Sequence, residues 1–129
     1  MCAPTLFRDR SDATQLVVGG LVPMALGGLA GVLVGVSAPA YWVIGALAAV
    51  GAFLAGFEHT DGWDAADRGL LGGIIYGTAL LLAHQLAGTR ALVSLGSVPA
   101  LLAVVTAVVG MLLSAAGGHI SGARRRTAT

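Results

Sequence analysis

The chain has 129 residues, of which 57% are hydrophobic and 10% are charged, and its mean hydropathy is +0.89. A soluble domain carries roughly 25% charged residues, so this composition excludes an ordinary soluble fold and indicates an integral membrane protein. The net charge of +1 leaves no broad basic face, so we expect no nucleic-acid partner. We therefore expect an all-α, multi-pass protein of a cell membrane or of a virion membrane, surrounded by lipid.

Three long stretches, residues 13–57, 69–89 and 91–123, contain no Asp, Glu, Lys or Arg. Because a helix needs about 20 residues to cross the hydrocarbon core, the first stretch holds two spans. We predict four transmembrane helices that form two hairpins in one domain of residues 1–129. The predicted spans lie near 14–36, 40–57, 69–88 and 98–120, with a cytoplasmic acidic loop at 58–67 and a basic tail at 123–129.

The first span needs separate comment, because two arginines precede it and Ala-Pro-Ala at 38–40 resembles a signal-peptide cleavage site. The apolar run 16–36 is much longer than the apolar region of a signal peptide, which has about 7 to 15 residues. We therefore expect a retained helix. Pro23 lies inside this run and removes a backbone donor, so it should kink the helix or shift its start.

Arginine distribution predicts the orientation, since all seven basic residues are Arg. Loops rich in Arg stay in the cytoplasm, and acidic residues contribute little to this rule. Arg90 alone lies on the other side, so both termini should be cytoplasmic. The arginines on the cytoplasmic side are Arg8, Arg10, Arg68, Arg124, Arg125 and Arg126.

Polar residues before the spans predict where the helices begin. Ser11 or Asp12 can cap the first span, and Asp64 or Asp67 the third. Ser37 and Ser97 each precede a proline by two residues, a pattern that is typical of a capped helix with proline in its first turn.

Small residues recur at every fourth position in three of the spans. This spacing places them on one stripe of a helix, which allows close contact between the backbones of neighbouring helices in lipid. We therefore predict that these stripes pack the helices. They are Gly27, Gly31 and Gly35; Gly69, Gly73 and Gly77; and Gly110, Ser114, Gly118 and Gly122.

Tyr76 and His84 are the buried polar candidates within the third span. His84 lies seven residues after Gly77 and should face another helix. In a functional role His84 would be a proton relay or a ligand of haem or a metal. In a structural role it would be a neutral histidine that is hydrogen-bonded across a helix interface. No acid or arginine lies in the middle of any span, which argues against a proton-coupled or ion-coupled transporter.

Glu58, His59, Asp61 and His119 are weak candidates for a metal site, since carboxylate and imidazole groups suit zinc and similar ions. Their spacing matches no strong ligand motif, and a solvated loop with interfacial histidines explains them better than a metal site does. No catalytic motif is present, so we expect no enzyme activity and no cofactor.

Two segments carry a resemblance: Gly-Ala-Phe-Leu-Ala-Gly-Phe at 51–57, followed by the acidic loop, and Gly-Gly-His-Ile-Ser-Gly-Ala-Arg at 117–124. Together they resemble small, glycine-rich, four-helix membrane proteins of halophilic archaea or of their viruses. The resemblance implies a fold and a habitat but no activity.

Three functions remain compatible with the sequence. The first is a non-enzymatic structural or accessory membrane protein, either a small subunit of a larger complex or a membrane-lining component, which would assemble with its partners through the glycine stripes. The second is a homo-oligomeric pore, such as a channel or a holin-like protein, because glycine stripes also pack helices around channels. The third is a small transporter, or an enzyme, with its site in the acidic loop, which would require binding of a metal or a substrate at Glu58, His59, Asp61 and Asp64.

Overall fold

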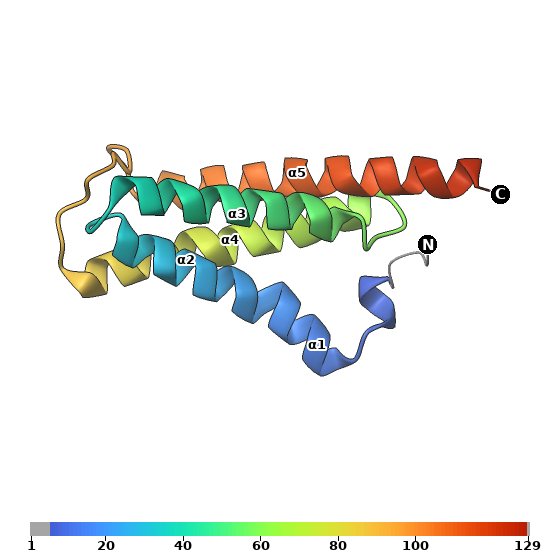
Figure 1. Cartoon of the computed structure of the whole chain (residues 1–129), viewed down its shortest axis with the longest axis horizontal. Coiled ribbons are helices and arrows are strands. Elements are labelled where there is room, and N and C mark those ends of the chain that lie inside the picture. Colours follow the sequence, from blue (N-terminus) through green and yellow to red (C-terminus); the bar gives the residue numbers. More distant parts are fainter. Residues whose placement is uncertain (1–5, 129) are drawn as a thin grey trace.

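The computed structural model describes residues 6–128, and every regular element in that range is helical. Four helical stretches are long and apolar enough to cross a membrane: Asp12–Leu33, Ala38–Gly56, Gly62–Ala87 and Ala100–Thr127. The elements, in chain order, are the 3₁₀-helix η1 (Phe7–Asp9), α1 (Asp12–Leu16), the π-helix η2 (Val17–Leu21), α2 (Val22–Leu33), α3 (Ala38–Gly56), α4 (Gly62–Ala87) and α5 (Ala100–Thr127) (Figure 1).

Helices α1, η2 and α2 form one continuous stretch. Ser11 caps it, because its side-chain oxygen accepts a hydrogen bond from the backbone N–H of Thr14 at 3.3 Å. The irregularity expected from Pro23 takes the form of the π-helix, which ends one residue before the helix that holds the proline. In this turn the N–H of Val22 bonds to the carbonyl of Val17, five residues back, which widens the helix.

The Ser-x-Pro pattern predicts one helix start and fails at the other. Ser37 caps α3 by accepting from the N–H of Ala40 at 3.3 Å, as expected. Ser97 makes no such bond, and α5 begins after Pro99 without a side-chain cap. The N–H of Leu101 donates instead to the Val98 carbonyl at 3.0 Å, so the backbone itself closes the first turn.

Helix α4 begins at Gly62, earlier than the predicted span at 69, so the expected acidic loop 58–67 is partly helix. The cap is Asp61, which accepts from the N–H of Asp64 at 2.9 Å, and it is neither Asp64 nor Asp67. The helix ends at Gly88, whose φ of 63° is a left-handed conformation that favours glycine.

The predicted basic tail 123–129 continues α5 as helix up to Thr127. Three arginines lie in this last turn, where positive charge is favourable next to the free carbonyls of a helix end. Thr129, at the end of the predicted tail, lies outside the described residues.

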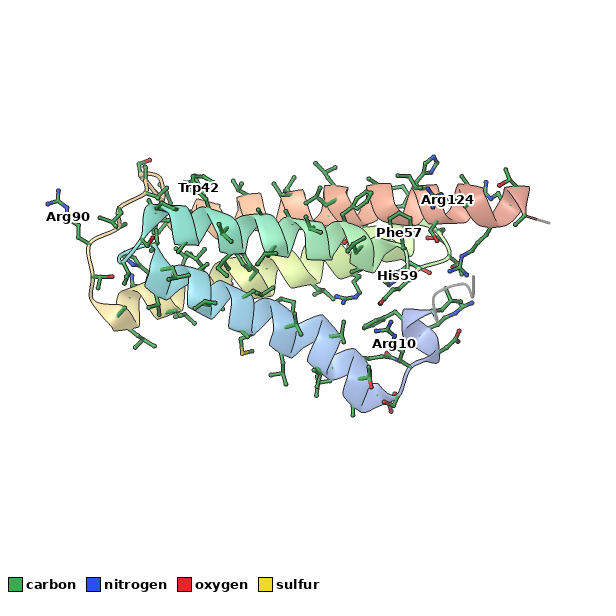
Figure 2. The ribbon with its side chains drawn as sticks, in the orientation of Figure 1. Arg10, Trp42, Phe57, His59, Arg90 and Arg124 are labelled. Carbon is green, nitrogen blue, oxygen red and sulfur yellow. The ribbon has the colours of Figure 1, made fainter. Side chains whose placement is uncertain are left out.

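Helices α4 and α5 run antiparallel and share the most extensive interface in the structure. Helix α2 packs mainly on α4, and α3 packs mainly on α5. The start of the first span and the end of α5 lie at the same end of the bundle (Figure 1). Arg10, His59 and Arg124 mark this end, whereas Trp42 and Arg90 lie at the opposite end (Figure 2).

Candidate functional site

The interior of the bundle consists almost entirely of small residues. Only two of the fully buried side chains, Val34 and Leu80, are large and apolar. In α3, none of the 18 consecutive residues with the highest mean hydropathy is buried. Large apolar side chains point outward instead, as suits a protein surrounded by lipid. The other buried side chains are Ala30, Ala65, Ala66, Ala107, Ser114 and Ser121.

Glycines bring α4 into backbone contact with α5. A Cβ added at Gly73 would overlap the Thr106 carbonyl oxygen and lie 2.6 Å from Cα of Ala107. Gly69 and Gly110 lie directly against each other in the same interface. No alanine fits at these positions unless the helices move apart.

The other predicted stripe residues face different neighbours. A Cβ at Gly27 or Gly31 would overlap backbone carbonyl oxygens of α4, and one at Gly118 would lie 2.6 Å from Cβ of Ala65. Gly35 and Gly122 lie near loops, at Thr89 and Thr60 respectively, rather than against another helix.

Two further glycines of this kind lie outside the predicted stripes. A Cβ at Gly56 would overlap the Ser114 carbonyl oxygen, and one at Gly117 would overlap that of Phe53. Both lie where α3 crosses α5. Gly117 could have been found from the sequence, because it lies seven residues after Gly110, and this spacing places Gly110 and Gly117 on one face of the helix.

Three hydroxyl groups of α5 bond to backbone carbonyls of its neighbours. Thr106 donates to Gly73 at 2.9 Å, Ser114 to Ala52 at 2.7 Å, and Ser121 to the Phe57 carbonyl just beyond α3 at 3.1 Å. Interhelical bonds of this type stabilise membrane bundles. These hydroxyls are therefore used in packing and do not line a polar path.

His84 and Tyr76 both lie beside α2. A Cβ at Gly31 would lie 3.0 Å from the backbone nitrogen of His84, and the buried Nδ1 of His84 has no hydrogen-bond partner among the described residues. The backbone carbonyl of Tyr76 contacts Gly27, and its hydroxyl would lie 4.0 Å from a Cβ at Gly45 in α3. No other ionisable group accompanies His84 in these contacts.

Most charged groups of the described chain, together with the rings of Phe7 and His59, gather at the end that holds both the start of the first span and the end of α5. Nη2 of Arg10 lies 2.6 Å from Oε1 of Glu58, and the two side chains are 27% and 17% exposed. The Phe7 ring stacks on the His59 ring at 5.7 Å between centroids, and the Arg68 guanidinium lies 4.4 Å from the centre of the Phe7 ring. We name these five residues the inner-end cluster, where the inner end denotes the end of the bundle that holds the start of the first span and the end of α5, and the outer end the opposite one.

Arg68 also compensates for the backbone irregularity of the first span. In η2 the N–H of Val22 bonds to Val17, and the next donor position is Pro23, which has no N–H. The carbonyl of Val18 is thus left without a helical donor. Nη2 of Arg68 donates to it at 3.3 Å, which ties α4 to the π-turn.

The predicted metal candidates have other roles in the structure. Glu58 pairs with Arg10, Nδ1 of His59 lies 3.1 Å from the Ala55 carbonyl, and Asp61 caps α4. His119 is exposed on α5 and lines a small cavity of about 50 Å³. Within residues 6–128, no three His, Cys, Asp or Glu side chains gather closely enough to hold a metal ion.

A larger cavity of about 260 Å³ lies at the same end, between η1, the α3–α4 connection and the first turns of α4. Its lining combines Phe7 and His59 with the exposed carboxylates Asp64 and Asp67. Thr60 also lines it, but Nδ1 of His59 lies against the Ala55 carbonyl, and no hydrogen bond among the described residues joins the Thr60 hydroxyl to a base.

Comparison of the chain with models of protein families, with curated proteins and with solved structures gave no match.

Proposed function

We propose that this chain is a non-enzymatic structural or accessory integral membrane protein, acting as a small subunit of a larger complex or as a membrane-lining component. The observation that carries the proposal is the combination of a solid interior of small residues with an outer surface of large apolar side chains. Such a molecule offers lipid and protein partners an apolar surface, and it has no ionisable pathway through its centre.

The outward faces of the helices argue against the alternative function of a pore. If copies of the chain assembled around a channel, residues on outward faces would line it. On α3 these residues are Trp42, Val43, Leu47, Val50 and Leu54, each more than half exposed. An apolar lining of this kind does not supply the continuous polar path that ion conduction needs, so the pore ranks second.

The glycine stripes do not argue for assembly, contrary to the reasoning from sequence. Gly27, Gly31, Gly69, Gly73 and Gly118 all meet other helices of the same chain. Association with a partner would therefore use the outward apolar faces. A transporter remains the third alternative, and it lacks support because the acidic groups of the α3–α4 connection lie at the bundle end and not at depth.

The function is tested with the tagged chain released from its own membrane with lipids retained. We expect native mass spectrometry to show a second membrane protein in fixed stoichiometry. We also expect the purified chain, reconstituted alone in liposomes, to leave ion flux at the level of empty liposomes. If the chain instead forms a homo-oligomer and the liposomes conduct ions above this level, the accessory role is wrong and the pore is the better explanation.

We further propose that the end bearing the inner-end cluster faces the cytoplasm, because six of the seven arginines gather there. Single cysteines in a Cys2→Ser background test this orientation. Ser94→Cys in the α4–α5 loop should react with a membrane-impermeant maleimide in intact cells, and Ala128→Cys only after permeabilisation. The reverse labelling pattern would invert the topology.

A further inference from the structure

The first span packs tightly on the bundle only in its outer half. Gly27 and Gly31 of α2 meet the backbone of α4, which fixes this part of the helix. Toward the inner end the helix leans away from the other three (Figure 1). Neither α1 nor η2 has a buried residue, and a Cβ added at Gly20 would meet nothing within 4 Å.

Helix contacts are few in the inner half of this span, where η2 lies close to α4 but α1 does not, and the segment before α1 supplies the other connections to the bundle. A Cβ at Gly19 would contact only the Phe7 ring at 3.4 Å and the Arg68 guanidinium at 3.8 Å. Phe7 comes from the segment before α1, which folds back toward the α3–α4 connection. There the N–H of Phe7 donates to the Glu58 carbonyl at 3.0 Å, and Arg10 pairs with the Glu58 carboxylate.

Gln15 joins this segment to the helix that follows it. Its Nε2 donates to the carbonyl of Arg10 at 2.9 Å and to that of Arg8 at 3.3 Å. Residues 6–10 and α1 are therefore one unit. Any movement of α1 away from the bundle has to break the contacts of Phe7 and Arg10 with the α3–α4 connection.

An irregular stretch of backbone separates this unit from the packed half. The stretch 17–23 contains the π-turn, two consecutive glycines and Pro23, and the Val18 carbonyl has only the Arg68 side chain as a partner. Sharp bends in helices occur at such π-turns and prolines. Pivoting here leaves the Gly27 and Gly31 contacts intact.

We propose that residues 6–10 act as a clasp, and that the inner half of the first span swings about residues 17–23 between a clasped and a released position. The clasp consists of the Arg10–Glu58 ion pair and the Phe7 ring between His59 and Arg68. Its ion pair is partly exposed, and such pairs are individually weak. In the released position Arg68 loses Phe7 and Val18 and faces the space between the first span and α4.

Distances between spin labels test the clasp in lipid nanodiscs, in a Cys2→Ser background. One pair, at exposed Ala13 in α1 and exposed Leu71 in α4, reports the position of the inner half. A second pair, at exposed Val32 and Leu82, reports the packed outer half. Wild type should give one dominant short distance for the Ala13–Leu71 pair.

Arg10→Gln and Phe7→Ala should each increase the population with a longer Ala13–Leu71 distance. For Arg10→Gln we expect an increase of about fivefold, which is the upper end of what exposed ion pairs contribute. The Val32–Leu82 distance should not change, which shows that the variants still fold. Arg10→Lys should restore the wild-type distribution, and Arg8→Gln, which removes an exposed charge from the same segment, should resemble wild type.

Two results would overturn the clasp. The first is an Ala13–Leu71 distribution that is the same in wild type, Arg10→Gln and Phe7→Ala, because helix packing or lipid would then position α1. The second is an equal shift in Arg8→Gln and Arg10→Gln, because general loss of charge would then account for the movement.

Discussion

Gly73→Leu is expected to destabilise the folded bundle by about 3 kcal/mol or more, since overpacking of a tight interface alone costs about 1 to 3 kcal/mol. The added side chain would meet the Thr106 carbonyl and Cα of Ala107, which are backbone atoms that cannot rotate away. It would also break the 2.9 Å hydrogen bond from Thr106 to the Gly73 carbonyl. Thermal unfolding in a mild detergent, followed by helical circular dichroism and by size-exclusion profile, measures this loss.

Gly51→Leu provides the matched control for this variant. Gly51 is exposed on α3, and a Cβ there meets nothing within 4 Å. Leucine also has a better helix propensity than glycine, by up to about 1 kcal/mol. Gly51→Leu should therefore unfold at the wild-type temperature or slightly above it, and equal destabilisation by the two variants would contradict the proposed close contact of α4 and α5.

Gly117→Leu should have the second-largest effect, because it separates α3 from α5. A Cβ at Gly117 would overlap the Phe53 carbonyl oxygen and lie 3.2 Å from Cα of Gly56, and leucine adds three further carbons beyond it. The hydrogen bond from Ser114 to Ala52 lies in the same interface and would also be lost. Since α3 packs mainly on α5, we expect a loss of about 2 to 3 kcal/mol in the same unfolding assay.

Ala116→Leu serves as the control next to it in the chain. Ala116 is exposed, whereas Gly117 is buried, although the two positions differ by one residue. We expect Ala116→Leu to leave the unfolding temperature close to that of wild type. Were Gly117→Leu equally harmless, the approach of α3 to α5 described here would be wrong.

The residues of the candidate site were only partly predictable from the sequence. Arg68 and Glu58 were visible as charges at span ends, and their polar character placed them at a membrane surface. Glu58 contacts Arg10, 48 residues earlier, and Arg68 contacts Phe7, 61 residues earlier, and no local pattern encodes such pairings. The hydrogen bond from Arg68 to Val18 depends further on the π-turn, which Pro23 suggested only as a kink or a shifted start.

The packing residues were also only partly predictable from the sequence. Four-residue spacing indicated that Gly69, Gly73 and Gly77 share a face, because helix geometry alone determines which residues lie together. It did not indicate which helix they meet, and the structure places α5 against them and α2 against another side of α4. Gly56 was missed because its importance comes from where α3 crosses α5, which depends on both helices.

By itself, the sequence determined the helical class, the number of helices able to cross a membrane and the end at which most charges gather, because hydropathy and helix periodicity are local properties. The tertiary structure alone decided that α4 starts at Gly62 with Asp61 as its cap, that the glycines pack helices of the same chain, and that residues 6–10 contact the α3–α4 connection. Each of these depends on which surfaces come together. Backbone contact and side-chain pairing between distant segments are properties of the packed helices and not of any one of them.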